Sequence, residues 1–121
     1  HDACHLAHGQ KVRAQPRELL RRIPGLVLVD LADSELCCGS AGVYNLLEPE
    51  LAGQLRERKL SNIAKVNPDV IVTANIGCMM QLKGGTSAPF VPTVEMLDWA
   101  TGGPAPEATE WRLSMGDVEL L

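Results

Sequence analysis

The sequence has few aromatic residues, no long apolar run and no excess of positive charge. Aromatic residues make up 3% of the 121 residues, so the core must be built from aliphatic side chains and methionine, which suits packed layers of helix and sheet. No apolar stretch approaches the roughly 20 residues that span a bilayer. The formal charge of −4 argues against nucleic-acid binding, which requires a basic surface. These absences predict a single globular domain with no transmembrane segment and no nucleic acid as a partner.

The first residues also lack the usual features of a chain start. The sequence does not begin with methionine, has no secretory signal, and opens inside a motif-like stretch, HDACH. We therefore expect a fragment of a longer protein. Without a secretory signal, we also expect a reducing compartment, in which clustered cysteines more often bind metal or carry out redox chemistry than form disulfides.

Three apolar stretches rich in β-branched residues predict strands, and the patterns around them predict helices. The predicted strands are Leu26–Leu31, Asp69–Ala74 and a weaker one within Pro89–Leu97. The predicted helices are Gln15–Ile23 and a longer one from Pro49 to about Val66. This alternation predicts an α/β fold, with a mostly parallel βαβ sheet and helices on both of its faces.

Two further predictions concern the surface of the long helix and the domain boundary. The long helix has an apolar stripe and a charged run, and we expect the charged run, which includes Arg58 and Lys59, to be solvated. The apolar stripe consists of Leu51, Leu55, Ile63 and Val66. Beyond Ala100 the sequence becomes polar and rich in glycine and proline, so we expect a domain over residues 1–100 and a linker or tail over residues 101–121.

The four cysteines lie where loops of one sheet edge are expected. Cys37 and Cys38 follow the first predicted strand, and Cys78 follows the second. Cys4 precedes the first helix, where a loop after an upstream strand would lie. Loops beyond the carboxyl ends of parallel strands converge on one crevice. The sequence therefore predicts that all four thiols, on loops at these strand ends, meet at one edge of the sheet.

Glycines surround these cysteines. Gly39 and Gly42 follow the adjacent pair, and Gly77 precedes Cys78. Glycine allows the backbone to approach a bulky inorganic group and to offer N–H donors to sulfur. We expect the glycines beside Cys37, Cys38 and Cys78 to have that role.

Histidine and methionine residues also lie close to the cysteines in the sequence. The histidines are His1, His5 and His8, which could donate hydrogen bonds to a site or replace a ligand, although we expect His1 and His8 to be solvated. We expect Met79 and Met80 to fill gaps in the core. A cysteine hydrolase built on Cys4 would need an oriented base, and no sequence pattern supplies one.

The ordered motifs HDAC, ELCCGSAG and ANIGC resemble the cysteine-rich CCG domain. That domain occurs in the iron–sulfur subunit of glycolate oxidase, in lactate-utilisation proteins and in the heterodisulfide reductase B subunit. The resemblance covers roughly residues 1–100 and is closest to the second CCG domain of the glycolate oxidase iron–sulfur subunit. It implies that the family's ligands correspond to Cys4, Cys37, Cys38 and Cys78.

The resemblance also implies a function and partners. Family members resemble relays that carry electrons from a flavin-containing subunit, which oxidises a 2-hydroxy acid such as glycolate, towards a quinone-type acceptor. Full-length relatives carry ferredoxin-type domains upstream in the same chain, so the fragment is not expected to be catalytic by itself. The implied location is the cytoplasm, or the inner face of the cytoplasmic membrane as a peripheral protein.

One position departs from the family pattern, and because of it the sequence does not decide which metal is bound. The fuller pattern ends in C-x-x-C, whereas Gln81 stands here in place of the second cysteine. Four thiolates can hold a 4Fe–4S cluster or a tetrahedral zinc ion, because both accept four sulfur ligands. The alternative function is therefore a structural zinc-binding or subunit-interaction domain without a redox role.

Overall fold

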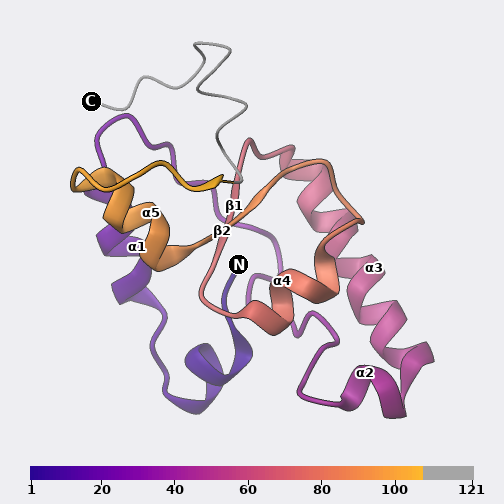
Figure 1. Cartoon of the computed structure of the whole chain (residues 1–121). Helices are drawn as coiled ribbons and strands as arrows, with labels where there is room; N and C mark the ends of the chain where they lie inside the picture. The colour runs from indigo at the N-terminus through magenta and orange to yellow at the C-terminus, as the bar shows by residue number, and fades with distance from the viewer. Residues whose placement is uncertain (108–121) are drawn as a thin grey trace.

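The computed structural model describes residues 1–107, in which a small parallel sheet lies among helices (Figure 1). The elements are η1, a π-helical turn (His5–Gly9), α1 (Ala14–Arg21), α2 (Tyr44–Leu47), α3 (Pro49–Val66), β1 (Ile71–Thr73), α4 (Ile76–Leu82), β2 (Phe90–Pro92) and α5 (Thr93–Ala100). Strands β1 and β2 pair in parallel, with Ile71 opposite Phe90, and α4 forms the crossover between them. None of the helices within residues 1–107 is long and apolar enough to cross a membrane.

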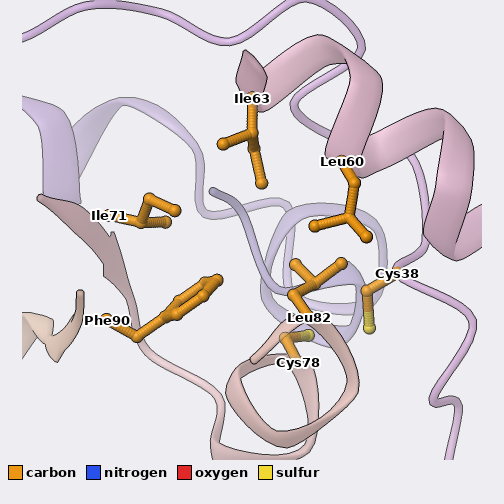
Figure 2. Packing of buried hydrophobic residues seen from close by; sticks show 7 residues of the cluster. All are labelled: Cys38, Leu60, Ile63, Ile71, Cys78, Leu82 and Phe90. Atoms are coloured by element: carbon orange, nitrogen blue, oxygen red, sulfur yellow. The ribbon is translucent and has the colours of Figure 1, made fainter. Parts of the chain in front are cut away.

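Apolar clusters lie on both faces of the sheet, because side chains alternate along a strand. Ile71 and Phe90 belong to a cluster with Leu60 of α3 and Leu82 of α4 (Figure 2). Val91 belongs to a second cluster, which contains residues of α1 and α5. The predicted combination of helices with a parallel sheet is therefore confirmed.

The sheet is smaller than predicted. Leu26–Leu31 forms no strand, and the described sheet has two strands only. A groove separates this segment from β1, so no ladder of backbone hydrogen bonds joins them. The segment is apolar, as its sequence shows, but it is not buried. Val27 and Val29 are 83% and 59% exposed, because nothing in residues 1–107 covers them.

The third predicted strand also needs correction. It begins as β2 but becomes α5 at Thr93, within the range Pro89–Leu97. Pro92 has no N–H to donate to a ladder, so the strand ends there. The tail predicted over residues 101–121 lies for the most part outside the described residues, and the domain boundary stays a prediction.

The long helix has the predicted bounds, but not the predicted surface. It starts at Pro49, where proline suits the first turn, and it stops at Asn67, whose left-handed φ of 49° terminates it. Leu51 of the predicted apolar stripe is 49% exposed, whereas Lys59 of the predicted solvated run is fully buried. The shorter predicted helix is confirmed as α1, with bounds that differ by one or two residues.

Arg17 of α1 ties the first residues of the chain to the segment that follows α1. Its Nη1 and Nη2 atoms donate to the two carboxylate oxygens of Asp2, each over 2.7 Å, and its Nε donates to Asp30 over 2.9 Å. Burial alone would raise the pKa of Asp2, but the hydrogen bonds and charge of Arg17 outweigh burial and bring that pKa below its ordinary value. This ion pair therefore contributes to stability as long as Asp2 is ionised.

We expect Arg17→Gln to lower the free energy of unfolding by about 2 kcal/mol, because a hydrogen bond to a charged group contributes about 1.5–3 kcal/mol. Arg58→Gln is the control. The Arg58–Asp33 pair is 63% and 46% exposed, so solvent screens it and we expect a smaller loss. Urea unfolding measures both variants.

The loss caused by Arg17→Gln depends on pH. The folded-state pKa of Asp2 is lowered, so the stabilisation is fully present above its ordinary pKa of 3.8 and disappears as the pH falls below it. Equal losses for the two variants, or a loss for Arg17→Gln that persists in acid, would contradict this assignment.

Candidate metal centre

The four cysteines come from three segments of the chain. Cys4 stands directly before η1, and Cys37 and Cys38 lie in the irregular segment that precedes α2. Cys78 lies in the first turn of α4, so it is on a helix and not on the predicted loop. Cys38 and Cys78 are buried in the apolar cluster that Figure 2 shows, whereas Cys4 and Cys37 are partly exposed.

The thiols form two hydrogen-bonded pairs, Cys38 with Cys78 and Cys37 with Cys4. Among the described residues, only the first pair belongs to a group of side chains close enough together to hold one metal ion. The hydrogen bond from Cys78 is the main reason that the pKa of Cys38 falls to about 6. The same bond, with burial, raises the pKa of Cys78. Burial raises the pKa of Cys37, and a hydrogen bond to Cys4 raises it further. The negative charges of Cys4 and Cys37 also raise the pKa of Cys78.

Backbone N–H groups point at these sulfurs. The N–H of Gly39 donates to the Cys37 sulfur over 3.3 Å, and the N–H of Ser40 helps to lower the pKa of Cys38. Gly39 has a φ of +94°, and a Cβ atom there would collide with the backbone oxygen of Ala52 in α3. The predicted N–H donation from Gly39 to sulfur is confirmed. The close approach that requires glycine here is to the backbone of α3, whereas the predicted approach to an inorganic group stays a prediction.

Helix α3 holds the segment that leads to Cys37. The buried ammonium of Lys59 donates to the backbone oxygens of Asp33 over 2.7 Å and Ser34 over 3.0 Å. Asn62, one turn later, donates to the oxygen of Ala32 over 3.0 Å. These bonds fix the path of the backbone just before the adjacent cysteines.

Lys59 also supplies positive charge beside the thiols. Burial lowers the pKa of Lys59, whereas the negative charge of Cys38 acts in the opposite direction and favours the ammonium. The prediction of a solvated Lys59 was wrong because a lysine was assigned to the surface by its type alone. The available signal was its spacing, four residues from both Leu55 and Ile63.

His1 lies at the cysteine site and is not solvated as predicted. Its two ring nitrogens are buried, and neither has a hydrogen-bond partner within the described residues. A ring nitrogen of His1 and the sulfurs of Cys38 and Cys78 lie within 4.8 Å of one another. His8, by contrast, is exposed as expected, and its Nε2 lies 3.1 Å from the backbone oxygen of Glu35.

Asn75 is a site residue that the sequence analysis missed. Its side-chain oxygen accepts the N–H of Cys78 over 3.1 Å and so caps α4, and its side-chain nitrogen lies 3.3 Å from Nδ1 of His5. It therefore connects η1 to the helix that carries Cys78. The available signal was an asparagine directly before a helical segment, a preferred capping residue.

Gln81, at the position where the family pattern has a further cysteine, takes part in helix packing. Its side-chain oxygen accepts a hydrogen bond from Asn45 over 3.2 Å, and its backbone oxygen accepts one from Arg56 over 2.7 Å. It thus links α4 to α2 and α3. Of the two neighbouring methionines, Met79 packs against the core as predicted, whereas Met80 is 66% exposed and does not.

The donor set fits a metal that prefers sulfur. The Cys38 and Cys78 thiols lie beside a buried imidazole, and the Ser40 N–H and the Lys59 ammonium act on Cys38. This set suits an iron–sulfur cluster or a tetrahedral zinc ion, and not the oxygen ligands that calcium or magnesium requires. Fold and site together define a small α/β domain with a thiol-rich candidate metal centre.

The chain belongs to the CCG family of cysteine-rich domains, whose model matches residues 1–83. It is 41% identical over 100 residues to the glycolate oxidase iron-sulfur subunit of Escherichia coli, covering 83% of this chain and 24% of that protein. It is 40% identical over 98 residues to the B subunit of fumarate reductase (CoM/CoB) from Methanothermobacter marburgensis, covering 81% of this chain and 20% of that protein.

Lactate utilization protein A of Shouchella clausii is 32% identical to the chain over 84 residues, which are 69% of this chain and 35% of that protein. The chain thus spans between a fifth and about a third of the length of these relatives. No solved structure matches it significantly.

We expect Gly39→Ala to lower the free energy of unfolding by about 2 kcal/mol or more. An alanine at positive φ costs about 1–2 kcal/mol, and its Cβ would also collide with α3. Gly42→Ala is the matched control, because Gly42 has a φ of +68° with open space around the added Cβ, so that only the cost of the backbone conformation applies. Urea unfolding of the metal-free protein distinguishes them, and equal losses would refute the close packing of Gly39.

In the metal-free protein we expect one thiolate to appear as the pH rises through about 6, the pKa of Cys38. Thiolate absorption in the ultraviolet measures this step. Cys78→Ala removes the hydrogen bond that most lowers this pKa, so the step should move towards the ordinary cysteine value of about 8.5. Cys4→Ala is the control and should leave the step in place. An unchanged step in Cys78→Ala would contradict the pairing.

Proposed function

We propose that this chain is an electron-transfer module that holds a 4Fe–4S cluster through Cys4, Cys37, Cys38 and Cys78. The close approach of the Cys38 and Cys78 sulfurs is the observation that carries the proposal. The charges of Cys4 and Cys37, which act on Cys78, support the wider ligand set. Relatives named as iron-sulfur subunits of glycolate oxidase support it. A bound cluster of this type supplies reversible one-electron transfer.

The residues of this chain would hold and tune that group. Apolar packing around Cys38 and Cys78 keeps water away from one side of the site. The N–H groups of Gly39 and Ser40 would stabilise negative charge on sulfur, and the Lys59 ammonium would add a positive charge nearby. Such hydrogen bonds and charges determine the reduction potential of a cluster.

The proposal extends to the complex in which the module works. The names of the relatives support a place in a glycolate oxidase-like oxidoreductase, in which a flavin-containing subunit oxidises the 2-hydroxy acid and electrons pass towards a quinone-type acceptor. Ferredoxin-type domains upstream in the same chain would continue the relay. We place the complex in the cytoplasm or at the inner face of the cytoplasmic membrane.

A structural zinc site is the second candidate. The proximity of a His1 ring nitrogen to the sulfurs of Cys38 and Cys78 favours it, because structural zinc sites commonly combine cysteine with histidine. In that case the domain would hold subunits together and carry no electrons.

Anaerobic purification followed by metal and sulfide analysis tests the proposal. We expect iron, acid-labile sulfide and a visible absorption that reduction bleaches. Serine replacement of Cys4, Cys37, Cys38 or Cys78 should abolish the iron content, whereas Met80→Ala, a change at an exposed position, should retain it.

Two outcomes would overturn parts of the proposal. A colourless anaerobic protein with stoichiometric zinc and no iron would reject the cluster in favour of the zinc site. Full iron content in any one of the four serine variants would remove that cysteine from the ligand set.

A further inference from the structure

An apolar groove runs between Leu26–Leu31 and β1, on the side of the sheet away from β2. Its volume is about 720 Å³. The side chains of the 26–31 segment and of Val70 and Val72 line it, with Met96 of α5 and Ile63 of α3 among the other lining residues. The wall at Val27 and Val29 is largely exposed, whereas Val70 and Val72 on the β1 wall are partly buried.

The β1 wall of this groove is a strand edge. The N–H of Ile71 points towards β2 and donates to the oxygen of Pro89 over 2.9 Å. Alternate residues of a parallel strand direct their backbone groups to opposite edges, so those of Val70 and Val72 face the groove. Within residues 1–107, no backbone hydrogen bond joins them to the 26–31 segment.

The backbone nitrogen of His1 already donates a hydrogen bond to this edge of β1. That nitrogen donates to the oxygen of Val72 over 3.0 Å, and Figure 1 places the N-terminus beside the two strands, in the middle of the molecule. An amide nitrogen would make the same bond without a charge.

We infer that a further β-strand binds in this groove. It would run parallel to β1 and be supplied by residues on the amino-terminal side of His1. The bond from His1 to Val72 has the form of a ladder bond. In a parallel ladder, the residue two positions before His1 would donate to the oxygen of Val70 and accept from the N–H of Val72. The strand would be apolar on both faces, because the groove covers both.

The inference gives the incomplete sheet a consistent explanation. With this strand in place, Leu26–Leu31 gains a partner and becomes the outer strand of a four-stranded parallel sheet. The new strand would end at His1, so it would fix Cys4 at the same sheet edge from which α4 carries Cys78.

An extension of the full chain tests this. About six residues of alternating valine and isoleucine, a usual strand length, are added before His1. One control extension has the same length in glycine and serine. A second is the apolar extension with proline at alternate positions, which removes N–H donors. We expect the first alone to raise the urea midpoint and to slow amide exchange at Val70 and Val72 at least tenfold.

Groove variants and the oligomeric state complete the experiment. Val29→Asp, on the groove wall, should abolish the gain from the apolar extension and leave the glycine–serine version unchanged. Val94→Asp is the control, because Val94 is 72% exposed and lies outside the groove.

Three results would overturn the inference. The first is an equal gain from the glycine–serine or the proline extension, and the second is a gain that survives Val29→Asp. The third is amide protection that appears only in dimers by sedimentation, which would mean that the strand comes from another copy. None of these readouts depends on bound metal, so the inference fails or stands separately from the proposed function.

Discussion

The contact between the sulfurs of Cys38 and Cys78 is the interaction on which the rest of the site depends. It joins the segment before α2 to the first turn of α4, and both sulfurs lie against the apolar cluster that contains Leu60 and Leu82. A buried thiolate requires compensation, because removing a charge from water is costly. Here the Cys78 thiol, the Ser40 N–H and the Lys59 ammonium provide it. The neighbouring elements serve this arrangement: α3 fixes the segment before Cys37 through Lys59 and Asn62, and Asn75 caps α4.

The same electrostatics explain why a cluster of thiols favours a bound metal. Four thiolates without a cation repel one another, and here the hydrogen bond from Cys78 to Cys38 lets one sulfur ionise while the other keeps its proton. A bound cation removes the need for that proton, since metals bind the thiolate form and release protons as they bind. We expect metal binding and folding to be coupled in this domain for that reason. The CCG family model matches residues 1–83, a range that includes all four cysteines.

Local patterns allowed α1 and α3 to be predicted, but not α2, α4 or α5. Contacts between distant segments did not follow from such patterns. The bounds of α3 follow from Pro49 and from the apolar period. The predicted meeting of all four cysteines on loops at strand ends stays a prediction, because Leu26–Leu31 forms no strand and Cys78 lies on α4. The strand at Leu26–Leu31 was wrong because a strand exists only with a hydrogen-bonded neighbour, which the pattern of one segment cannot show. Lys59 was misplaced because its partners are backbone oxygens of Asp33 and Ser34, far along the sequence. His1 was misplaced because burial of a terminal residue leaves no periodic signal.

X-ray absorption at the iron edge of the anaerobically prepared protein is the most direct test of the central claim, that the four thiols form one cluster site. The account predicts an iron environment of sulfur alone, with a second shell of neighbouring iron atoms. This spectrum should be the same for the wild-type protein and for His1→Phe, because the imidazole is not counted among the ligands. An iron environment without iron neighbours, or one that contains nitrogen and changes in His1→Phe, would contradict it.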